Sequence, residues 1–201
     1  MVHPLQLPLV DLASPAAPAQ LGAACEGVGF ARVRGHGIPR GRLEEAVGRA
    51  RAFFALPREA RLALAPRAFR PASPNVYRGY FPLQPESDTL KEGFEIGRGA
   101  GGAGGSAGAG GATPFEEPDV WPAEAALPGF RAFLEPLHAE LQGVGERVME
   151  ALARHLGLAP THFRPWFEGS VSTLRLLHYP GSASHPFAAP AHVDSGLVTL
   201  L

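Results

Sequence analysis

One long helical pattern sets the main constraint on the fold of this 201-residue chain. From Leu127 to Gly157, apolar residues recur every three or four positions, which predicts a helix with one continuous face in the core. The apolar positions are Phe130, Phe133, Leu134, Leu137, Leu141, Val144, Val148, Leu152 and Leu156. Pro128 suits the start of this helix, Gly157 suits its end, and Pro136 is expected to kink its first turns. We therefore predict a long spine helix.

Shorter patterns lie on both sides of the spine helix. Those before it are residues 7–12 (strand), 19–28 (helix), 30–34 (strand) and 42–56 (helix). After it, the sequence patterns of residues 170–179 and 191–201 are typical of strands, and no further helical pattern follows. Two strands after a long helix favour an antiparallel β end to the chain. The fold class predicted from these patterns is α+β.

A glycine-rich segment at residues 97–112 interrupts the middle of the chain, with nine glycines among its sixteen residues. It has too few side chains to offset the backbone entropy lost on folding, so we expect a disordered surface loop that can be deleted from Gly99 to Gly111. Gly97, Gly99 and Gly102 form a G-x-G-x-x-G spacing. A dinucleotide site would need a helix directly after it, and more glycine follows instead.

Composition excludes several classes of protein. The net charge is −1 and no basic run occurs, so no nucleic-acid or acidic-membrane partner is expected. Cys25 is the only cysteine, which excludes an internal disulfide and a cysteine-based zinc cluster, and we expect it to be a small buried residue. The start of the chain lacks a basic n-region, and no window approaches the roughly 18 uninterrupted apolar residues of a membrane span. A cytoplasmic protein is expected.

The sharpest chemical signal is the pair His192 and Asp194. On a strand, residues i and i+2 project from the same face, so an imidazole and a carboxylate could reach one ion together. With one further histidine, such a pair forms the facial triad that binds iron(II). The motif alone is weak, because H-x-D spacings occur by chance. The apolar run that follows it, up to Leu201, reads as a buried strand and supplies the expected context.

Several segments occur in the order seen in one known family. They are Pro8–Asp11, Gly29–Pro39, Ala52–Pro57, Arg78–Pro82, Lys91–Ile96, Trp121–Pro122 with Phe130–Phe133, Leu174–Pro180 and His192–Leu200. In this order the chain resembles the isopenicillin N synthase-like branch of the iron(II)- and 2-oxoglutarate-dependent oxygenases. The resemblance implies a non-haem dioxygenase N-terminal region at 1–120, a spine helix and connector at 121–168, and the first strands of a double-stranded β-helix (jelly roll) at 169–201.

The resemblance also implies a reaction and a set of site residues. Iron(II) on His192, Asp194 and a further histidine would use 2-oxoglutarate and molecular oxygen, with ascorbate as an auxiliary reductant, to hydroxylate, desaturate or cyclise a small organic molecule. Tyr179 matches a tyrosine that lines the family's co-substrate or substrate pocket. Further expected contacts are Arg175, which shares a strand face with Tyr179, and Arg78 and Tyr80, which match substrate contacts of some members.

Two features that the family places after the H-x-D motif lie further downstream than this sequence extends. They are the second iron-binding histidine and the Arg-x-Ser that binds 2-oxoglutarate. We therefore expect these 201 residues alone to make no succinate and to be poorly soluble, and the complete form to be a monomer. His185 is the only other histidine near the motif, but a loop position fixes ligand geometry poorly. Two alternatives stay open: a non-catalytic fragment or paralogue, and an iron oxidase that uses no 2-oxoglutarate.

Overall fold

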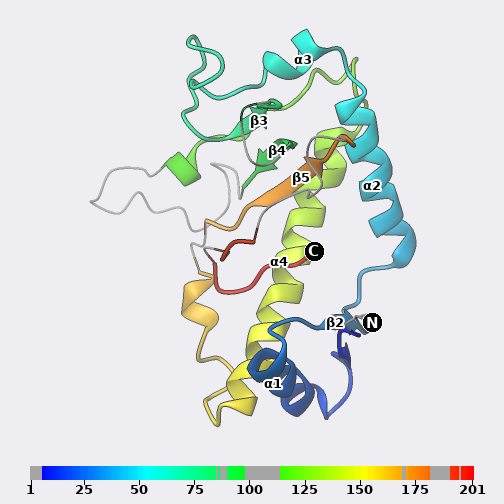
Figure 1. Cartoon of the computed structure of the whole chain (residues 1–201), viewed down its shortest axis with the longest axis vertical. Coiled ribbons are helices and arrows are strands. Elements are labelled where there is room, and N and C mark those ends of the chain that lie inside the picture. The colour runs from blue at the N-terminus through cyan, green and yellow to red at the C-terminus, as the bar shows by residue number, and fades with distance from the viewer. Residues whose placement is uncertain are drawn as a thin grey trace. The chain divides into compact units, whose positions relative to one another are not determined.

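The computed structural model describes residues 6–84, 86, 90–97, 114–168, 171–181, 191–194 and 196–201. Its elements in chain order are β1 (Leu9–Asp11), α1 (Ala17–Gly27), β2 (Arg32–Arg34), α2 (Arg40–Phe54), α3 (Arg58–Leu62), β3 (Gly79–Phe81), β4 (Glu92–Ile96), η1 (Pro114–Glu116), α4 (Phe130–His155), η2 (Arg164–Trp166) and β5 (Leu174–His178) (Figure 1). Most of the glycine-rich segment and His185 lie outside the described residues, so the expectations for them stay predictions.

The internal contacts divide the chain into two compact units. Unit 1 comprises Met1–Pro39, Glu140–Glu168 and Gly196–Leu201, and unit 2 comprises Arg40–Ala139 and Gly169–Ser195. Helix α4 therefore supplies residues to both units.

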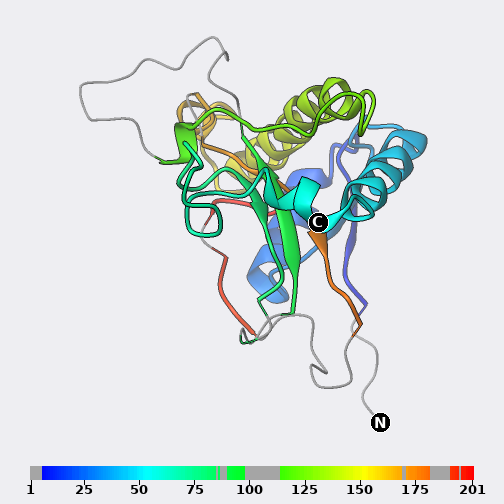
Figure 2. The same ribbon diagram turned by 90° about the horizontal axis from the view of Figure 1, so that it is seen from above.

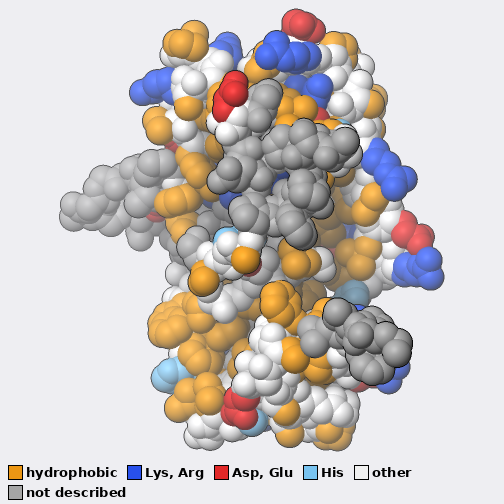
Figure 3. Space-filling model, viewed as in Figure 1, with side chains coloured by type: hydrophobic (Ala, Val, Ile, Leu, Met, Phe, Trp, Pro, Cys, Tyr) orange, Lys and Arg blue, Asp and Glu red, His pale blue; other side chains and the backbone are white. Residues whose placement is uncertain are grey.

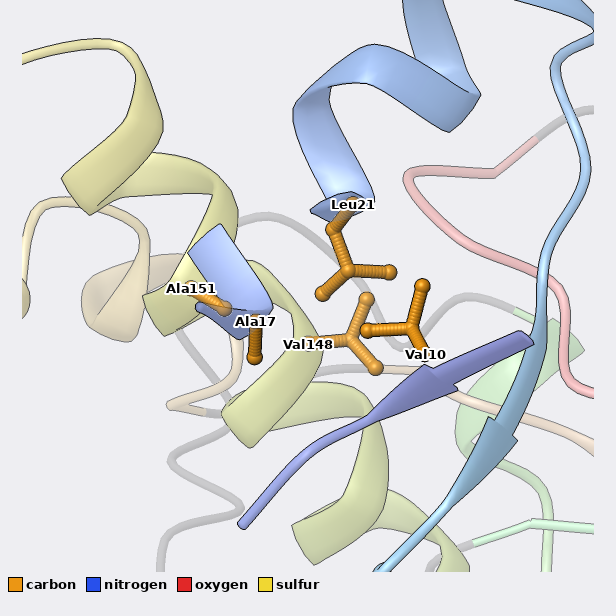
Figure 4. Close-up of a cluster of buried hydrophobic side chains, with 5 residues drawn as sticks. All are labelled: Val10, Ala17, Leu21, Val148 and Ala151. Atoms are coloured by element: carbon orange, nitrogen blue, oxygen red, sulfur yellow. The ribbon is translucent and has the colours of Figure 1, made fainter. Parts of the chain in front are cut away.

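A small apolar core in unit 1 joins β1, α1 and the second half of α4. Val10, Ala17, Leu21, Val148 and Ala151 are buried in one cluster, and Figure 4 shows their side chains converging from these three elements. Burying a valine or leucine side chain of this kind stabilises the fold by about 1.5–3 kcal/mol. β1 also pairs in parallel with β2, so this cluster fixes both strands against the two helices.

Helices α1 and α4 approach closely within unit 1 at Gly22. A Cβ atom at this position would collide with the imidazole ring of His155. The same ring lies with its Nε2 atom 3.0 Å from Oε1 of Glu26, one turn further along α1. A side chain at position 22 would therefore require the His155 ring to move.

Unit 2 contains a three-stranded antiparallel sheet in the order β3-β4-β5. The strand registers place Tyr80, Glu92 and Phe94 on one face, which we call the helix-covered face. Figures 1 and 2 show α2 and the start of α4 on this side of the sheet. The opposite face, which we call the far face, carries Phe81, Gly93, Glu95, Arg175 and Leu177.

An aromatic cluster fills the space between the helix-covered face and the helices. Phe53 of α2 stacks on Phe130 of α4 at 5.5 Å between ring centroids, and Phe94 of β4 lies 4.5 Å from Phe53. All three rings are essentially inaccessible to solvent. Trp121 adds a further edge-on contact to Phe94. This cluster holds the sheet to the helices of unit 2.

The predicted helices and the early strands are confirmed with boundary shifts of a few residues. The spine helix runs from Phe130 to His155 and includes Pro136. The prediction of a strand over 191–201 is wrong for its described residues, 191–194 and 196–201, which have no regular secondary structure. A strand needs a hydrogen-bonded neighbour, and the described sheets pair only β1 with β2 and β3, β4 and β5 with one another.

Two side chains also lie in environments that the sequence did not predict. Cys25 is exposed, because α1 buries the face formed by Ala17, Leu21 and Ala24 instead. His138 of α4 is a buried polar residue, 7% exposed. Its Nε2 atom lies 3.2 Å from the carbonyl oxygen of Ser172, and this partner makes burial possible.

Charged side chains are spread over the outer face of α2. Figure 3 shows acidic and basic groups interspersed along the edge of the molecule that α2 forms. They include the i, i+4 pairs Arg40–Glu44 and Glu45–Arg49, with N–O distances of 2.7 Å. In the part of the chain that the structure describes, no helix combines the length and apolar character needed to cross a membrane.

Candidate functional site

His192 and Asp194 lie side by side, as the sequence predicted. The Nε2 atom of His192 is 3.2 Å from Oδ1 of Asp194. Two ligand atoms that each bind a divalent metal at about 2.1 Å, at right angles, are themselves about 3 Å apart. Both side chains are more than half exposed, so an ion could reach them. The i, i+2 spacing thus brings the donors together although the segment is not a strand.

No third protein ligand joins this pair within the described part of the chain. Among those residues, no group of three or more histidine, cysteine, aspartate or glutamate side chains could hold a metal ion. The pair nevertheless suits the chemistry of the predicted ion, because iron(II) binds imidazole nitrogen and carboxylate oxygen. His192 and Asp194 could therefore supply two of the three protein ligands of a facial triad.

The far face of the sheet carries the second group of predicted site residues. Arg175 and Leu177 lie on it, and Tyr179 follows directly after the end of β5. The Arg175 side chain is 43% exposed. Leu177 and Tyr179 are exposed to a similar extent. These side chains are accessible to a small molecule.

Arg175 is held in place by two neighbours on its inner side. Its Nε atom lies 2.6 Å from Oε1 of Glu95, the residue directly opposite on β4. Its Nη2 atom donates a hydrogen bond of 3.3 Å to the hydroxyl oxygen of Tyr77. Burial is the largest single influence on the pKa of Arg175 and lowers it, but Glu95 and Tyr77 together outweigh burial, so the pKa is raised. Burial, together with Glu95, also raises the pKa of the Tyr77 phenol. Arg175 is therefore a fixed cation, and Tyr77 a neutral phenol.

Arg78 and Tyr80, the other predicted substrate contacts, are buried. Arg78 is fully inaccessible, and its guanidinium donates to Oγ1 of Thr173 at 2.8 Å and to the carbonyl oxygen of Phe115 at 2.7 Å. Burial lowers the pKa of Arg78. The Tyr80 hydroxyl donates to Glu92, and burial followed by this contact raises the pKa of Tyr80. Both side chains hold the sheet together, and a role in substrate binding stays a prediction for them.

Glu92 is the centre of a polar network on the helix-covered face. Its side chain is only 4% exposed and accepts hydrogen bonds from Arg61 and Tyr80. On its other oxygen, Oε1, the Nδ1 atom of His178 lies at 2.8 Å. Neither Glu92 nor Glu95 was among the site residues predicted from the sequence. The strand Glu92–Ile96 is otherwise apolar but contains two carboxylates. Because buried charges need partners, this pattern could have indicated a polar network at these positions.

A second carboxylate fixes the segment that leads into β3. Glu117 accepts hydrogen bonds from the backbone N–H groups of Val76 at 2.6 Å, Tyr77 at 2.9 Å and Arg78 at 3.1 Å. Burial acts to raise the pKa of Glu117, but the three backbone donors outweigh it and lower the pKa below its usual range. Because Tyr77 contacts Arg175, Glu117 also helps to define the far-face site.

Comparison with known proteins gives a consistent set of relatives. Residues 7–124 match the family described as the N-terminal region of a non-haem dioxygenase in morphine synthesis. The chain is 31% identical over 194 residues to the proline hydroxylase buaE of Petromyces alliaceus, covering 89% of this chain and 56% of that protein. It is also 31% identical over 215 residues to the 2-oxoglutarate-dependent dioxygenase frbA of Dothideomycetidae sp., covering 98% and 63% respectively.

The similarity extends to solved structures. A putative 2OG-Fe(II) oxygenase family protein from Caulobacter crescentus superposes with a TM-score of 0.68 at 32% identity, over 87% of this chain and 56% of that one. A C-terminally truncated protein of Neurospora crassa, solved in its apo form, gives a TM-score of 0.67 at 25% identity, over 87% and 62%. The chain thus spans between about half and two thirds of the length of these relatives.

Proposed function

The chain belongs to the iron(II)- and 2-oxoglutarate-dependent oxygenase family, and we propose that it serves the oxidation of a small organic molecule by molecular oxygen with 2-oxoglutarate as co-substrate. The observation that carries this proposal is the His192–Asp194 pair, whose donor atoms lie 3.2 Å apart in a family that uses iron(II). The match of residues 7–124 to the family's N-terminal region supports it independently.

The residues of this chain have separate tasks in the proposed reaction. His192 and Asp194 would hold iron(II), which when bound couples the oxidative decarboxylation of 2-oxoglutarate to oxidation of the substrate. Tyr179 and Arg175, on the accessible side of β5, would bind and orient the co-substrate or the substrate. Glu95 and Tyr77 would fix the guanidinium of Arg175 while it does so.

The proposal includes a domain assignment. Residues 1–120 would form the N-terminal region of the oxygenase, and 121–168 the spine helix and its connector. Residues 169–201 would begin the jelly roll, with β5 as its first strand. The mixed α/β architecture and the superposition on the Caulobacter crescentus oxygenase support this assignment.

Metal binding tests the site directly. Mn(II), a divalent ion with similar ligand preferences that is stable in air, is titrated into the protein while free Mn(II) is measured by electron paramagnetic resonance. We expect His192→Ala and Asp194→Ala each to weaken binding by about tenfold or more, since each removes a ligand. His162→Ala is the matched control, because that ring packs on Phe163 and Trp166 instead. Equal affinity in all four proteins would contradict the metal site.

Turnover distinguishes the proposed function from its alternatives. Succinate is measured after addition of iron(II), ascorbate and 2-oxoglutarate, with His192→Ala as the control. Succinate above the control establishes the oxygenase activity for these 201 residues. Oxygen uptake without succinate would instead favour an oxidase that uses no 2-oxoglutarate. Metal binding without either is the result that the sequence predicts for these 201 residues alone.

A further inference from the structure

We propose that the outer edge of the Arg175 guanidinium binds a carboxylate group of the substrate, whose apolar body then lies against Tyr77 and Phe81. This inference rests on the proposed function, because it assumes that the far face of the sheet is part of the substrate pocket. It narrows the substrate class to small molecules that join a carboxylate to an aromatic or alkyl group.

Two neighbours orient the guanidinium of Arg175. Glu95 occupies its Nε atom and Tyr77 its Nη2 atom, so both contacts lie on one side of the guanidinium. Within the part of the chain that the structure describes, the Nη1 atom has no hydrogen-bond partner. A guanidinium held in this way presents a preformed pair of N–H donors, which matches the two oxygens of a carboxylate.

Glu95 is a buried carboxylate directly opposite Arg175 in the sheet. Its side chain is 7% exposed, yet its Oε2 atom is buried and has no hydrogen-bond partner among the described residues. A buried carboxylate needs a compensating charge, and Arg175 supplies it. Holding Arg175 at its Nε atom, beside Tyr77, is the task that the geometry shows for Glu95.

Aromatic side chains lie beside Arg175. Tyr77, which contacts the guanidinium, lies 5.7 Å from Phe81 and 4.8 Å from Phe115 between ring centroids. Phe81 is on the far face with Arg175, opposite Gly93, and the Leu177 side chain lies over Gly93 on its other side. Phe115 is 43% exposed. A cation beside accessible aromatic rings suits a ligand with an anionic head and an apolar body.

Phenylacetate is the test ligand, and phenylacetamide is its neutral counterpart of the same shape. Binding is measured by ligand-observed NMR on the full chain, without iron or oxygen, so that it is independent of the metal titration and of turnover. We expect phenylacetate to bind about tenfold more tightly than phenylacetamide, because only a carboxylate accepts two charge-assisted hydrogen bonds from the Arg175 guanidinium. Arg175→Met should abolish this preference, and Arg175→Lys should reduce it.

Glu95→Gln gives a result of opposite sign. Glutamine keeps an oxygen that can accept from the Nε atom of Arg175 but removes the competing negative charge, so phenylacetate should bind about threefold more tightly. The exposed pair Arg40 and Glu44 provides the matched controls Arg40→Met and Glu44→Gln, neither of which should change binding. Thermal midpoints measured alongside show whether each variant is folded.

Three results would overturn the proposal. The first is equal binding of phenylacetate and phenylacetamide by the folded wild-type protein. The second is weaker phenylacetate binding in both Arg175→Met and Glu95→Gln, together with a lower thermal midpoint in each variant. That result would assign the Arg175–Glu95 pair a purely structural role. The third is tighter binding of 2-oxoglutarate than of phenylacetate through Arg175, which would assign this edge to the co-substrate. None of these results would affect the His192–Asp194 metal site, so failure here is distinguishable from failure of the proposed function.

Discussion

Replacing Glu117 by glutamine is expected to destabilise the protein through the segment that leads into β3. The carboxylate accepts three backbone hydrogen bonds, one on Oε1 and two on Oε2. Glutamine has a single acceptor oxygen, so at least one bond is lost and an amide N–H₂ is turned toward a backbone donor. Hydrogen bonds to charged groups contribute about 1.5–3 kcal/mol each, and partial exposure of this site reduces that figure. We expect a loss of about 1–3 kcal/mol at pH 7.

The effect has a defined dependence on pH. The pKa of Glu117 is lowered in the folded protein relative to its ordinary value of 4.5. The ionised carboxylate therefore stabilises the fold fully above that value, and this contribution is lost as the pH falls through the lower folded-state pKa. The pKa of Asp119 is raised by burial, which gives the opposite trend. Comparing Glu117→Gln with wild type cancels that trend, because both proteins contain Asp119.

Urea unfolding at several pH values between about 3 and 8 measures this difference. The Glu44→Gln variant is the control, since its carboxylate is 61% exposed and should contribute only a few tenths of a kcal/mol. Amide hydrogen exchange at residues 76–78 should also become faster in Glu117→Gln. The reasoning fails if Glu117→Gln has wild-type stability at pH 7, or if the difference from wild type grows as the pH falls below about 4.

Other substitutions test the packing of each unit. Gly22→Ala should lower the thermal midpoint, because its methyl group would collide with the His155 ring, whereas Gly27→Ala in the same helix meets nothing within 4 Å and should leave the midpoint unchanged or raise it. The opposite ranking would contradict the close approach of α1 and α4. Phe53→Ala should cost about 3–5 kcal/mol in urea unfolding, since the ring is fully buried among Phe94, Phe130 and Tyr80. A loss below about 1 kcal/mol would show that the aromatic cluster is not the core of unit 2.

Much of the organisation could be predicted from local sequence patterns. The spine helix was predicted from periodicity alone, because a helix satisfies its backbone hydrogen bonds within its own segment and needs only one apolar face. The pairing of His192 with Asp194 was also local, since a spacing of two residues keeps their donor atoms close. The alternation of a strand also predicted the segment that contains Arg175, which lies in β5 opposite Glu95.

Contacts between distant residues determined what the sequence could not indicate. The run 191–201 looked like a strand, but its described residues join no sheet, because a strand depends on a partner that its own sequence does not specify. Arg78 was predicted as a substrate contact, yet it is buried, and its guanidinium donates to Thr173, 95 residues away, and to the carbonyl oxygen of Phe115. Glu95 forms an ion pair with Arg175 because the pairing of β4 with β5 places the two residues opposite each other. Helical periodicity and short spacings are local properties of the chain, whereas the partner of each buried charge is decided when the strands pair.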